Sequence, residues 1–239
     1  ASVSASLSQP FNEQFTLSAG TTLDATRSTD YELRAQGEDD YVEQVTLSFP
    51  LGATYNTVKA PLDPQAGNRV SLGVEPGISF GDGEASYTRI TSSASTYRKI
   101  SDRLVAAVRA EAGTFLGDEG VPVDRKFFAG GGGSVRGFEY QSLSPTDSDG
   151  NIIGGDAMFA ASLELRWRKS ERWGYVAFVD SGYAADSIDE AFGEMRTSFG
   201  LGVRFYPGFG PVRFDIATPL DRRDGEDPVQ IYVSIGQSF

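Results

Sequence analysis

Apolar and polar residues alternate along most of the chain. Between residues 68 and 80, for example, Val70 and Leu72 alternate with Ser71 and Gly73. A β-strand directs successive side chains to opposite faces, so a period of two predicts a sheet with one apolar and one polar face. The pattern recurs in about eleven segments, at 2–9, 13–24, 43–56, 68–80, 85–99, 103–117, 157–168, 173–184, 196–206, 211–220 and 230–239.

The predicted strands are long. Many contain ten or more residues, whereas strands in soluble sheets average about 5–6 residues. A tilted strand needs about 9–11 residues to cross a bilayer. No segment shows a convincing helical period, so the pattern favours an all-β protein whose strands cross a membrane.

The connections between the predicted strands alternate in length. Short turns are expected at 10–13, 100–103, 169–172 and 207–210. Long polar connections are expected at 24–42, 118–156, 184–195 and 221–229. Short periplasmic turns and long extracellular loops are typical of outer-membrane barrels. Residues 81–84 depart from this rule because they are short where a long loop is expected, and residues 57–67 make a medium periplasmic turn.

The fold predicted for residues 1–239 is a transmembrane antiparallel β-barrel. A soluble β-sandwich or jelly roll also alternates, but strand length, loop asymmetry and the lack of a second apolar face disfavour both. The outward face should contact lipid through Leu72, Leu165, Trp167, Leu201 and Phe205. The inward face should carry Arg109, Glu111, Glu164, Arg166 and Arg204.

Composition narrows the functions that remain. The chain has 239 residues, is 39% hydrophobic and carries a net charge of −12. No run of 18 apolar residues occurs, which excludes a spanning helix. The acidic balance disfavours nucleic acid as a partner, because binding phosphates requires clustered lysine and arginine. No signal peptide heads the chain, so we expect any export signal to have been removed.

The absent residue types exclude much of enzyme chemistry. Without cysteine there is no disulfide, thiolate nucleophile or zinc–thiolate site. Without histidine there is no Ser–His triad and no imidazole metal site. Catalysis by carboxylates, Ser–Lys or tyrosine stays open, but the sequence indicates no cofactor, no metal and no enzyme.

The longest connection, 118–156, contains apolar residues that do not suit a solvated loop. Phe127, Phe128, Val135 and Phe138 surround a run of four glycines. A phosphate-binding loop is excluded because no Gly-Lys-Ser/Thr follows and no helix opens there. A flexible surface loop is the next alternative, but the apolar content predicts a loop that folds into the barrel.

The sequence of this loop resembles a known family. Residues 135–138 (VRGF) resemble the VRGF/Y motif that the Omp85 superfamily carries in its sixth extracellular loop. Further blocks follow in family order at 127–133, 140–145, 161–164, 178–182, 200–204, 210–215 and 235–239. The FFAGG and FVDSG blocks are most similar to the TamA (translocation and assembly module) branch. The resemblance is strong from about residue 118 onward and weaker before it.

The resemblance implies a sixteen-stranded barrel preceded by POTRA domains. Neither the POTRA domains nor the first five strands fall in this sequence, so we expect the C-terminal eleven strands of a longer protein, truncated at the N-terminus. An odd number of strands also leaves the chain ends on opposite sides of the membrane. Eleven strands cannot close as the parent barrel does. Other strands, a second chain or a rearrangement into a smaller barrel would then be needed.

The resemblance also implies a function in the Gram-negative outer membrane. TamA-like barrels assemble and insert client outer-membrane proteins such as autotransporters, together with a TamB-like periplasmic partner and without covalent chemistry. Their first and last strands pair weakly, so the seam opens and an edge strand templates an incoming strand. A two-partner protein-secretion pore, a passive porin and an outer-membrane enzyme are the alternatives.

The resemblance and the alternation together assign a loop lock. Its residues are Arg136, Gly137, Phe138, Asp180 and Glu164. A guanidinium in a partly dry lumen needs acidic partners, and the matching arginine of the family contacts the two strands that carry these acids. We therefore expect Arg136 inside the barrel, paired with Asp180 and also with Glu164. The alternative is a solvated arginine on a mobile loop.

The last predicted strand is assigned a lateral gate and a C-terminal signal. Ile231, Val233, Ile235, Gln237 and Phe239 share one face, and the terminal aromatic resembles the β-signal of outer-membrane proteins. An ordinary last strand that ends on phenylalanine by chance is the alternative. Gly236 matches the glycine at which the family's last strand kinks inward, although it could also be simply a small lumen-facing residue.

Overall fold

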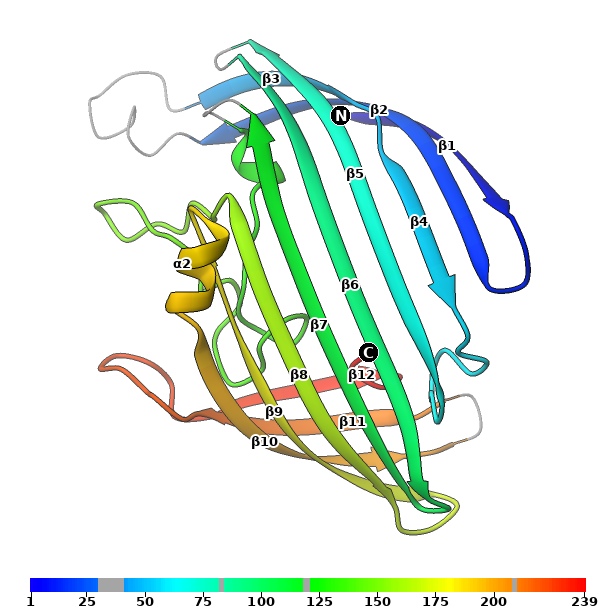
Figure 1. Ribbon diagram of the computed structural model, residues 1–239. Coiled ribbons are helices and arrows are strands. Elements are labelled where there is room, and N and C mark those ends of the chain that lie inside the picture. The colour runs from blue at the N-terminus through cyan, green and yellow to red at the C-terminus, as the bar shows by residue number, and fades with distance from the viewer. Residues whose placement is uncertain (30–40, 82–83, 118–120, 208–209) are drawn as a thin grey trace.

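The computed structural model describes residues 1–29, 41–81, 84–117, 121–207 and 210–239. In this part of the chain, twelve strands form a single antiparallel sheet that curves around a lumen (Figure 1). The strands are β1 (Ser2–Pro10), β2 (Phe15–Thr29), β3 (Tyr41–Ser48), β4 (Leu51–Asn56), β5 (Gly67–Gly81), β6 (Ala85–Ser101), β7 (Leu104–Gly117), β8 (Ala157–Arg168), β9 (Trp173–Ala185), β10 (Arg196–Phe205), β11 (Val212–Pro219) and β12 (Gln230–Ile235).

One predicted strand is interrupted. The segment expected at 43–56 is divided into β3 and β4 at Phe49 and Pro50. Both parts pair with β2 and β5, and the pairing resumes in the same register after the break. Proline has no N–H to donate to a neighbouring strand, which explains the interruption. The eleven predicted strand positions are therefore correct, and the count of twelve comes from this break.

The sheet does not close on itself. Strand order follows the chain from β1 to β12, and within the described sheet β1 pairs with β2 alone and β12 with β11 alone. Of the alternatives for closure, rearrangement of the chain into a smaller closed barrel is therefore wrong. Unpaired N–H and C=O groups in lipid cost several kcal/mol each. The need for other strands or a second chain at these edges accordingly stays a prediction.

The two faces of the sheet are as the alternation predicts. Leu201 is 58% exposed on the outer face, whereas Arg204 is fully buried on the inner face. Leu72, Leu165 and Trp167 are also exposed on the outside. Near the turn at 169–172 the outer face is aromatic, with ring pairs Trp167–Tyr175 and Trp173–Phe205 at 5.8 and 5.0 Å. Aromatic girdles of this kind mark the membrane interface of outer-membrane barrels.

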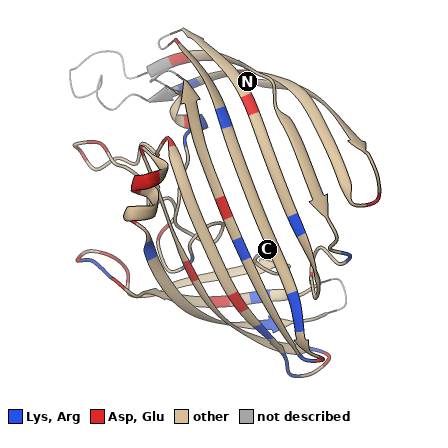
Figure 2. Ribbon diagram, viewed as in Figure 1, with Lys and Arg blue, Asp and Glu red and all other residues tan. Residues whose placement is uncertain are grey.

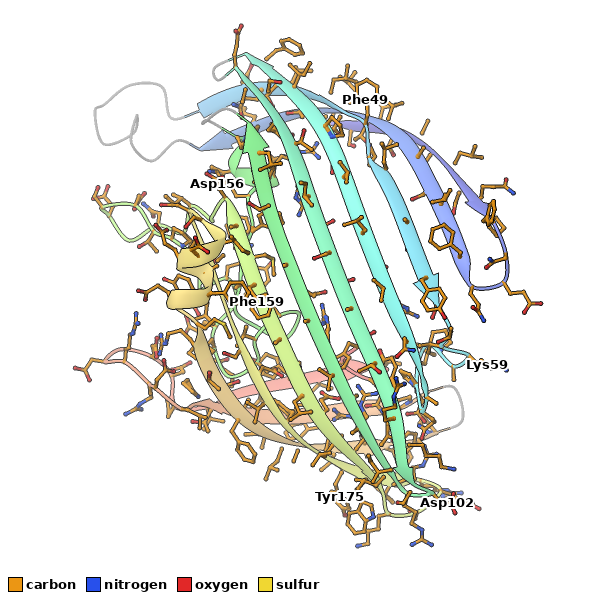
Figure 3. The ribbon with its side chains drawn as sticks, viewed as in Figure 1. Phe49, Lys59, Asp102, Asp156, Phe159 and Tyr175 are labelled. Atoms are coloured by element: carbon orange, nitrogen blue, oxygen red, sulfur yellow. The ribbon has the colours of Figure 1, made fainter. Side chains whose placement is uncertain are left out.

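Short and long connections lie at opposite ends of the sheet. Asp102, in a short turn, and Lys59, in the medium turn at 57–67, lie at one end, and Asp156, in the longest connection, lies at the other (Figure 3). The sequence predicts no helix, but the long connections contain a 3₁₀ turn, η1 (Val123–Arg125), and a helix, α2 (Ile188–Gly193). Ser187 accepts a hydrogen bond from the backbone of Glu190 and so caps α2, a local signal that alternation does not contain.

Parts of four predicted connections lie outside the described residues, namely 30–40, 82–83, 118–120 and 208–209. Among the helices that the structure describes, none is long and apolar enough to cross a membrane.

Candidate functional site

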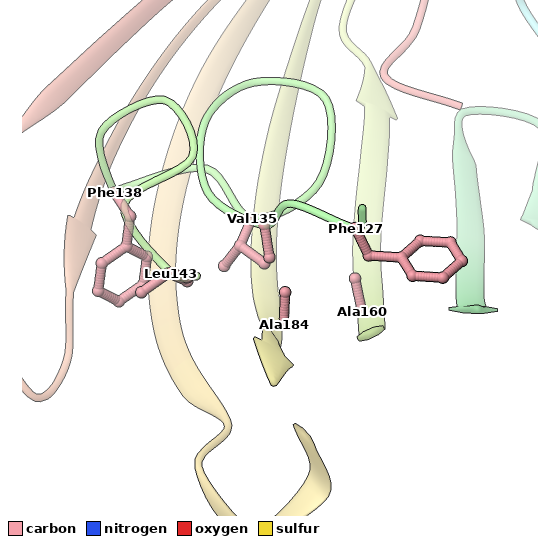
Figure 4. Close-up of a cluster of buried hydrophobic side chains, with 7 residues drawn as sticks. Phe127, Val135, Phe138, Leu143, Ala160 and Ala184 are labelled. Carbon is pink, nitrogen blue, oxygen red and sulfur yellow. The ribbon is translucent and has the colours of Figure 1, made fainter. Parts of the chain in front are cut away.

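The described part of the longest connection, residues 121–156, lies within the curve of the sheet. Its apolar side chains form a buried cluster with the inner faces of β8 and β9 (Figure 4). Backbone bonds reinforce this cluster, since the Leu143 N–H donates to Ala129 O and the Ala184 N–H donates to Leu143 O. The members of the cluster are Phe127, Ala129, Val135, Phe138, Leu143, Ala160 and Ala184.

A glycine on the wall makes room for the loop. The ring of Phe127 lies so close to Gly113 of β7 that an added Cβ would be 2.2 Å from the ring. A larger residue at position 113 would therefore displace the ring. In the middle of the loop, Gly137 has a φ of +96°, which side chains rarely adopt, and an added Cβ would meet Ser198 of β10 at 2.7 Å. Gly137 is thus needed for both its backbone conformation and its close approach to the wall.

The motif at 135–138 contacts the last strand as well as β10. The Gly137 N–H donates to the hydroxyl of Tyr232, 2.9 Å away, and that hydroxyl donates to the Phe138 carbonyl at 3.0 Å. The Ser198 hydroxyl donates to the Arg136 carbonyl. The loop is therefore bonded to both β10 and β12, which lie on either side of β11.

The guanidinium of Arg136 is 2% exposed and binds Asp180 in a bidentate manner. Its Nε and Nη2 lie 2.7 and 3.0 Å from the two carboxylate oxygens, and the Arg136 backbone N–H donates to the same group at 3.1 Å. Nη1 lies 2.8 Å from Glu164 and 3.1 Å from Asp215. The structure thus brings together Arg136, Asp180 and Glu164, as expected from sequence, and adds Asp215.

The ion pairs continue beyond Arg136. Asp215 also binds Arg204, and Glu164 binds Arg166 with 2.7 Å between Nε and Oε2. Glu164, Asp180 and Asp215 are at most 1% exposed. Figure 2 shows charged positions on neighbouring strands in this part of the sheet. Sequence reasoning missed Asp215 as a partner, although alternation along 211–220 places it opposite Phe214 and so on the inner face.

The electrostatics of this network suit a lock and not a reaction. Burial lowers the pKa of the Arg136 guanidinium, but its hydrogen bond to Asp180 and the charges of Glu164, Asp180 and Asp215 together raise that pKa above its ordinary value. Arg136 therefore stays charged at any physiological pH. All three carboxylates are occupied by arginines, which leaves none placed as a proton donor or acceptor. Among the described residues, no cluster could hold a metal ion.

A second arginine ties the loop to the opposite wall. Arg125, in η1, binds Asp24 of β2 and lies 3.2 Å from Glu75 of β5. Lys126 pairs with Asp156 at the loop's other end, 2.5 Å away. The loop therefore contacts both halves of the sheet. These anchors were not predicted, because their partners are far apart in sequence and meet only when the sheet curves.

The end of the chain differs from its prediction. Ile231, Val233 and Ile235 are at least 59% exposed on the outer face. The strand stops at Ile235, Gly236 has a φ of +92°, and the chain turns into the lumen (Figure 1). The prediction that Phe239 shares the outer face with these residues is therefore wrong, because the positive φ of Gly236 redirects the chain. The bend at the glycine is present, and its role in a gate stays a prediction.

Comparisons with known proteins agree with this geometry. A family model described as the Omp85 superfamily domain matches residues 1–239. The outer membrane protein assembly factor BamA of Nitratidesulfovibrio vulgaris is 36% identical over 152 residues, which are 60% of this chain and 19% of the relative. The chain thus spans about a fifth of that relative's length.

Solved structures share the fold. BamA from Haemophilus ducreyi lacking POTRA domains 1–3 has a TM-score of 0.76 at 21% identity, over 96% of this chain and 53% of that one. CdiB from Acinetobacter baumannii has a TM-score of 0.62 at 15% identity, over 96% of this chain and 40% of that one. The match of the family model over the whole sequence shows that this chain belongs to the Omp85 superfamily.

Proposed function

We propose that this chain is the membrane-embedded part of a factor that assembles and inserts other proteins in the Gram-negative outer membrane. The observation that carries the proposal is the shortness of β12, which has six residues and ends at Ile235, just before the bend at Gly236. A short strand makes few ladder bonds with any strand beside it, so its edge can be exposed and can template a strand of an incoming protein. The name of the related BamA, an outer membrane protein assembly factor, supports the same role.

The loop lock supports insertion at an edge over free passage through the lumen. Residues 121–156 occupy the space beside β8, β9 and β10, and ion pairs hold them there. A passive porin needs an open, water-filled channel, which a loop fastened to both walls opposes. The apolar outer face beside β12 would let a client strand enter lipid directly as it pairs.

Within the superfamily we place the chain in the TamA branch. The FFAGG and FVDSG blocks support this placement. In that branch the clients include autotransporters, and a TamB-like protein is the periplasmic partner. A two-partner secretion pore is the alternative that the test below must separate.

The first test is depletion of the full-length protein, followed by quantification of surface proteins. Loss of several barrels or autotransporters is the expected result. Loss of one dedicated secreted substrate would instead assign a secretion pore and overturn the proposal.

A second test locates client contact on the barrel. A photo-crosslinking residue at Val233, on the outer face of β12, should capture newly made barrel proteins. The same residue at Leu165, equally outward but on the central strand β8, is the matched control and should capture few. Equal capture at both positions would contradict insertion at the β12 edge.

A further inference from the structure

The last four residues, 236–239, form a C-terminal tail that is bound inside the lumen. Gln237 donates from Nε2 to Asp63 and accepts from Arg204 Nε, both at 2.9 Å. Its backbone N–H donates to the Leu62 carbonyl. None of these three bonds is part of the sheet. Side chains and the turn at 57–67 bind the tail, as they would bind a ligand.

The ring of Phe239 packs into a socket of apolar side chains and arginines. The backbone oxygen of Phe239 accepts a hydrogen bond from Arg166 Nη2 at 3.2 Å, and the guanidinium of Arg166 lies 5.1 Å from the ring centre. On another side the guanidinium of Arg109 lies 5.9 Å from the ring centre. The apolar side chains of the socket are Val58, Tyr97, Val105 and Ala107.

Between these two contacts, Ser238 reaches the loop lock. Its hydroxyl donates to Oε1 of Glu164, the same oxygen that lies 2.8 Å from Nη1 of Arg136. The other oxygen of Glu164 binds Arg166, which also holds Phe239. Glu164 is therefore shared by the loop, which precedes it in the sequence, and the tail, which follows it.

Sharing a fully buried carboxylate makes the two segments depend on each other. Each donor to Glu164 offsets part of the cost of removing that charge from water. Ser238 and Arg166 also hold the carboxylate of Glu164 in the position in which Arg136 binds it. When the tail leaves, Glu164 and Arg166 lose contacts that fix their side chains, so the loop must order Glu164 again in order to bind it. Such coupling is reciprocal by thermodynamic necessity.

We propose that the C-terminal tail is a releasable intramolecular ligand of the lumen. Glu164 couples the binding of this tail to the inward position of the 121–156 loop. Gly236 is the hinge, since its conformation separates the sheet-bound part of β12 from the tail. Release of the tail frees the end of β12 and weakens the loop lock together. The inference follows from the contacts and does not depend on the proposed function.

Amide hydrogen exchange of the full-length protein in lipid nanodiscs tests the coupling. Ser238→Ala removes one bond to Glu164 and nothing else. We expect the tail amides of Gly236 and Gln237 to exchange faster, and the loop amides of Arg136 and Gly137 to exchange faster by roughly 5-fold or more, the low end of measured couplings. Ser238→Thr keeps the hydroxyl and should restore protection in both places.

The reverse arm and the control complete the experiment. Glu164→Gln should expose the tail amides as well as the loop amides. Ser142→Ala is the matched control, because that hydroxyl lies in the same loop but bonds to the Glu139 carbonyl, and it should leave the tail unchanged.

Two results would overturn the coupling. One is a Ser238→Ala protein whose tail loosens while its loop amides stay within about twofold of the unmodified protein. The other is a Ser238→Ala protein with no change in either segment. If Ser238→Ala does not fold, Phe239→Leu loosens the tail while Ser238 and Glu164 themselves stay unaltered. Phe239→Leu must then loosen the loop, or the proposal fails.

Discussion

Arg136 contacts three carboxylates, Asp180, Glu164 and Asp215, in a lumen where all four side chains are buried. One guanidinium cannot neutralise three negative charges. Asp215 is also bound by Arg204, so the site is a chain of alternating charges and not a single pair. Removing one member of such a chain uncovers the charges beside it, which costs more than a surface ion pair does.

Truncation of Arg136 should therefore destabilise the barrel strongly. We expect Arg136→Ala to lower the free energy of unfolding by about 3–5 kcal/mol. Arg136→Lys should lower it less, because an ammonium keeps the charge but cannot hold Asp180 with two parallel bonds. Urea titration of the full-length protein in lipid vesicles measures both. Arg222→Ala, at an exposed arginine, should stay within about 0.5 kcal/mol. Equal effects of Arg136→Ala and Arg222→Ala would contradict a buried lock.

Gly137 offers a second test at the same scale. Gly137→Ala combines a positive φ with a Cβ that would lie 2.7 Å from Ser198. Gly150→Ala has a similar φ of +86° but meets no described atom within 4 Å, so it is the matched control for backbone strain alone. Strain alone costs about 1–2 kcal/mol. We expect unfolding titrations to show a clearly larger loss for Gly137→Ala. The same loss for both would mean that contact with Ser198 is unimportant.

Sequence patterns could place some of these residues and not others. Alternation puts Glu164, Asp180 and Asp215 on the inner face, because an apolar residue that faces outward precedes each of them, namely Leu163, Val179 and Phe214. Alternation does not say which of them Arg136 reaches. That depends on the curvature that brings β11 toward β8, which is a property of the whole sheet. The partner Asp215 was missed for this reason, while Asp180 and Glu164 came from the family motif.

At the scale of elements, the loop at 221–229 is fastened by Arg196 of β10. The guanidinium of Arg196 binds Asp221 at 2.7 Å and Glu226 at 2.7 and 3.0 Å. It also lies 4.9 Å from the ring centre of Phe138 in the inward loop. Two long connections thus meet on one side chain.

This contact predicts that acid loosens the 221–229 loop. The hydrogen bond from Arg196 lowers the pKa of the Glu226 carboxyl from its ordinary value of 4.5, against the opposing effect of burial. A lowered pKa in the folded state means that the stabilisation is present above pH 4.5 and is lost as pH falls through the lowered pKa. This sequence has no cysteine, so Asp224→Cys introduces a single site for a spin label. The label should gain mobility only in acid.

The control for this prediction is Glu226→Gln. The label should then be more mobile at neutral pH and should change less on acidification, because the titrating group is gone. A label that loosens equally in both proteins would assign the acid response to another group.

Element boundaries were predictable where the pattern is local. The period of two gives eleven strand positions, and the structure has all of them. It does not give the break at Pro50, since the neighbours of that strand keep one register across it. The period of two also predicts that the last strand continues to residue 239, because Gln237 and Phe239 keep the alternation. In the structure the strand stops before Gly236, whose φ is positive. A single backbone angle, which hydropathy does not contain, decides the difference.

At the scale of the molecule, the sheet has one face for lipid and one for a filled lumen. The outer face exposes large apolar side chains along β5, β7, β8, β9 and β10. A soluble sandwich would cover such a face with a second sheet, and the described residues form one sheet. The inner face is occupied by the 121–156 loop and the C-terminal tail, so the polar core is built from chain segments and not from an empty channel.

A pair of adjacent substitutions tests this division directly. Leu72 is exposed on the outer face of β5, and its neighbour Ser71 lies on the inner face beside a cavity of about 350 Å³. The same charge introduced at these two positions enters two different environments one residue apart. Leu72→Arg places a guanidinium in lipid, where it costs about 2–4 kcal/mol at the bilayer midplane. Ser71→Arg places it in a polar lumen that has room for it.

We therefore expect Leu72→Arg to lower the free energy of unfolding in vesicles by about 2–4 kcal/mol and Ser71→Arg by less than about 1 kcal/mol. In the urea-unfolded chain both residues are exposed to water, so the two substitutions differ in free energy only in the folded state. Since strand register fixes which side chains face lipid, a one-residue slip of β5 would reverse the order of the two effects. A larger loss at Ser71 than at Leu72 would mean that the sheet faces the membrane with its charged side, which would refute the transmembrane arrangement.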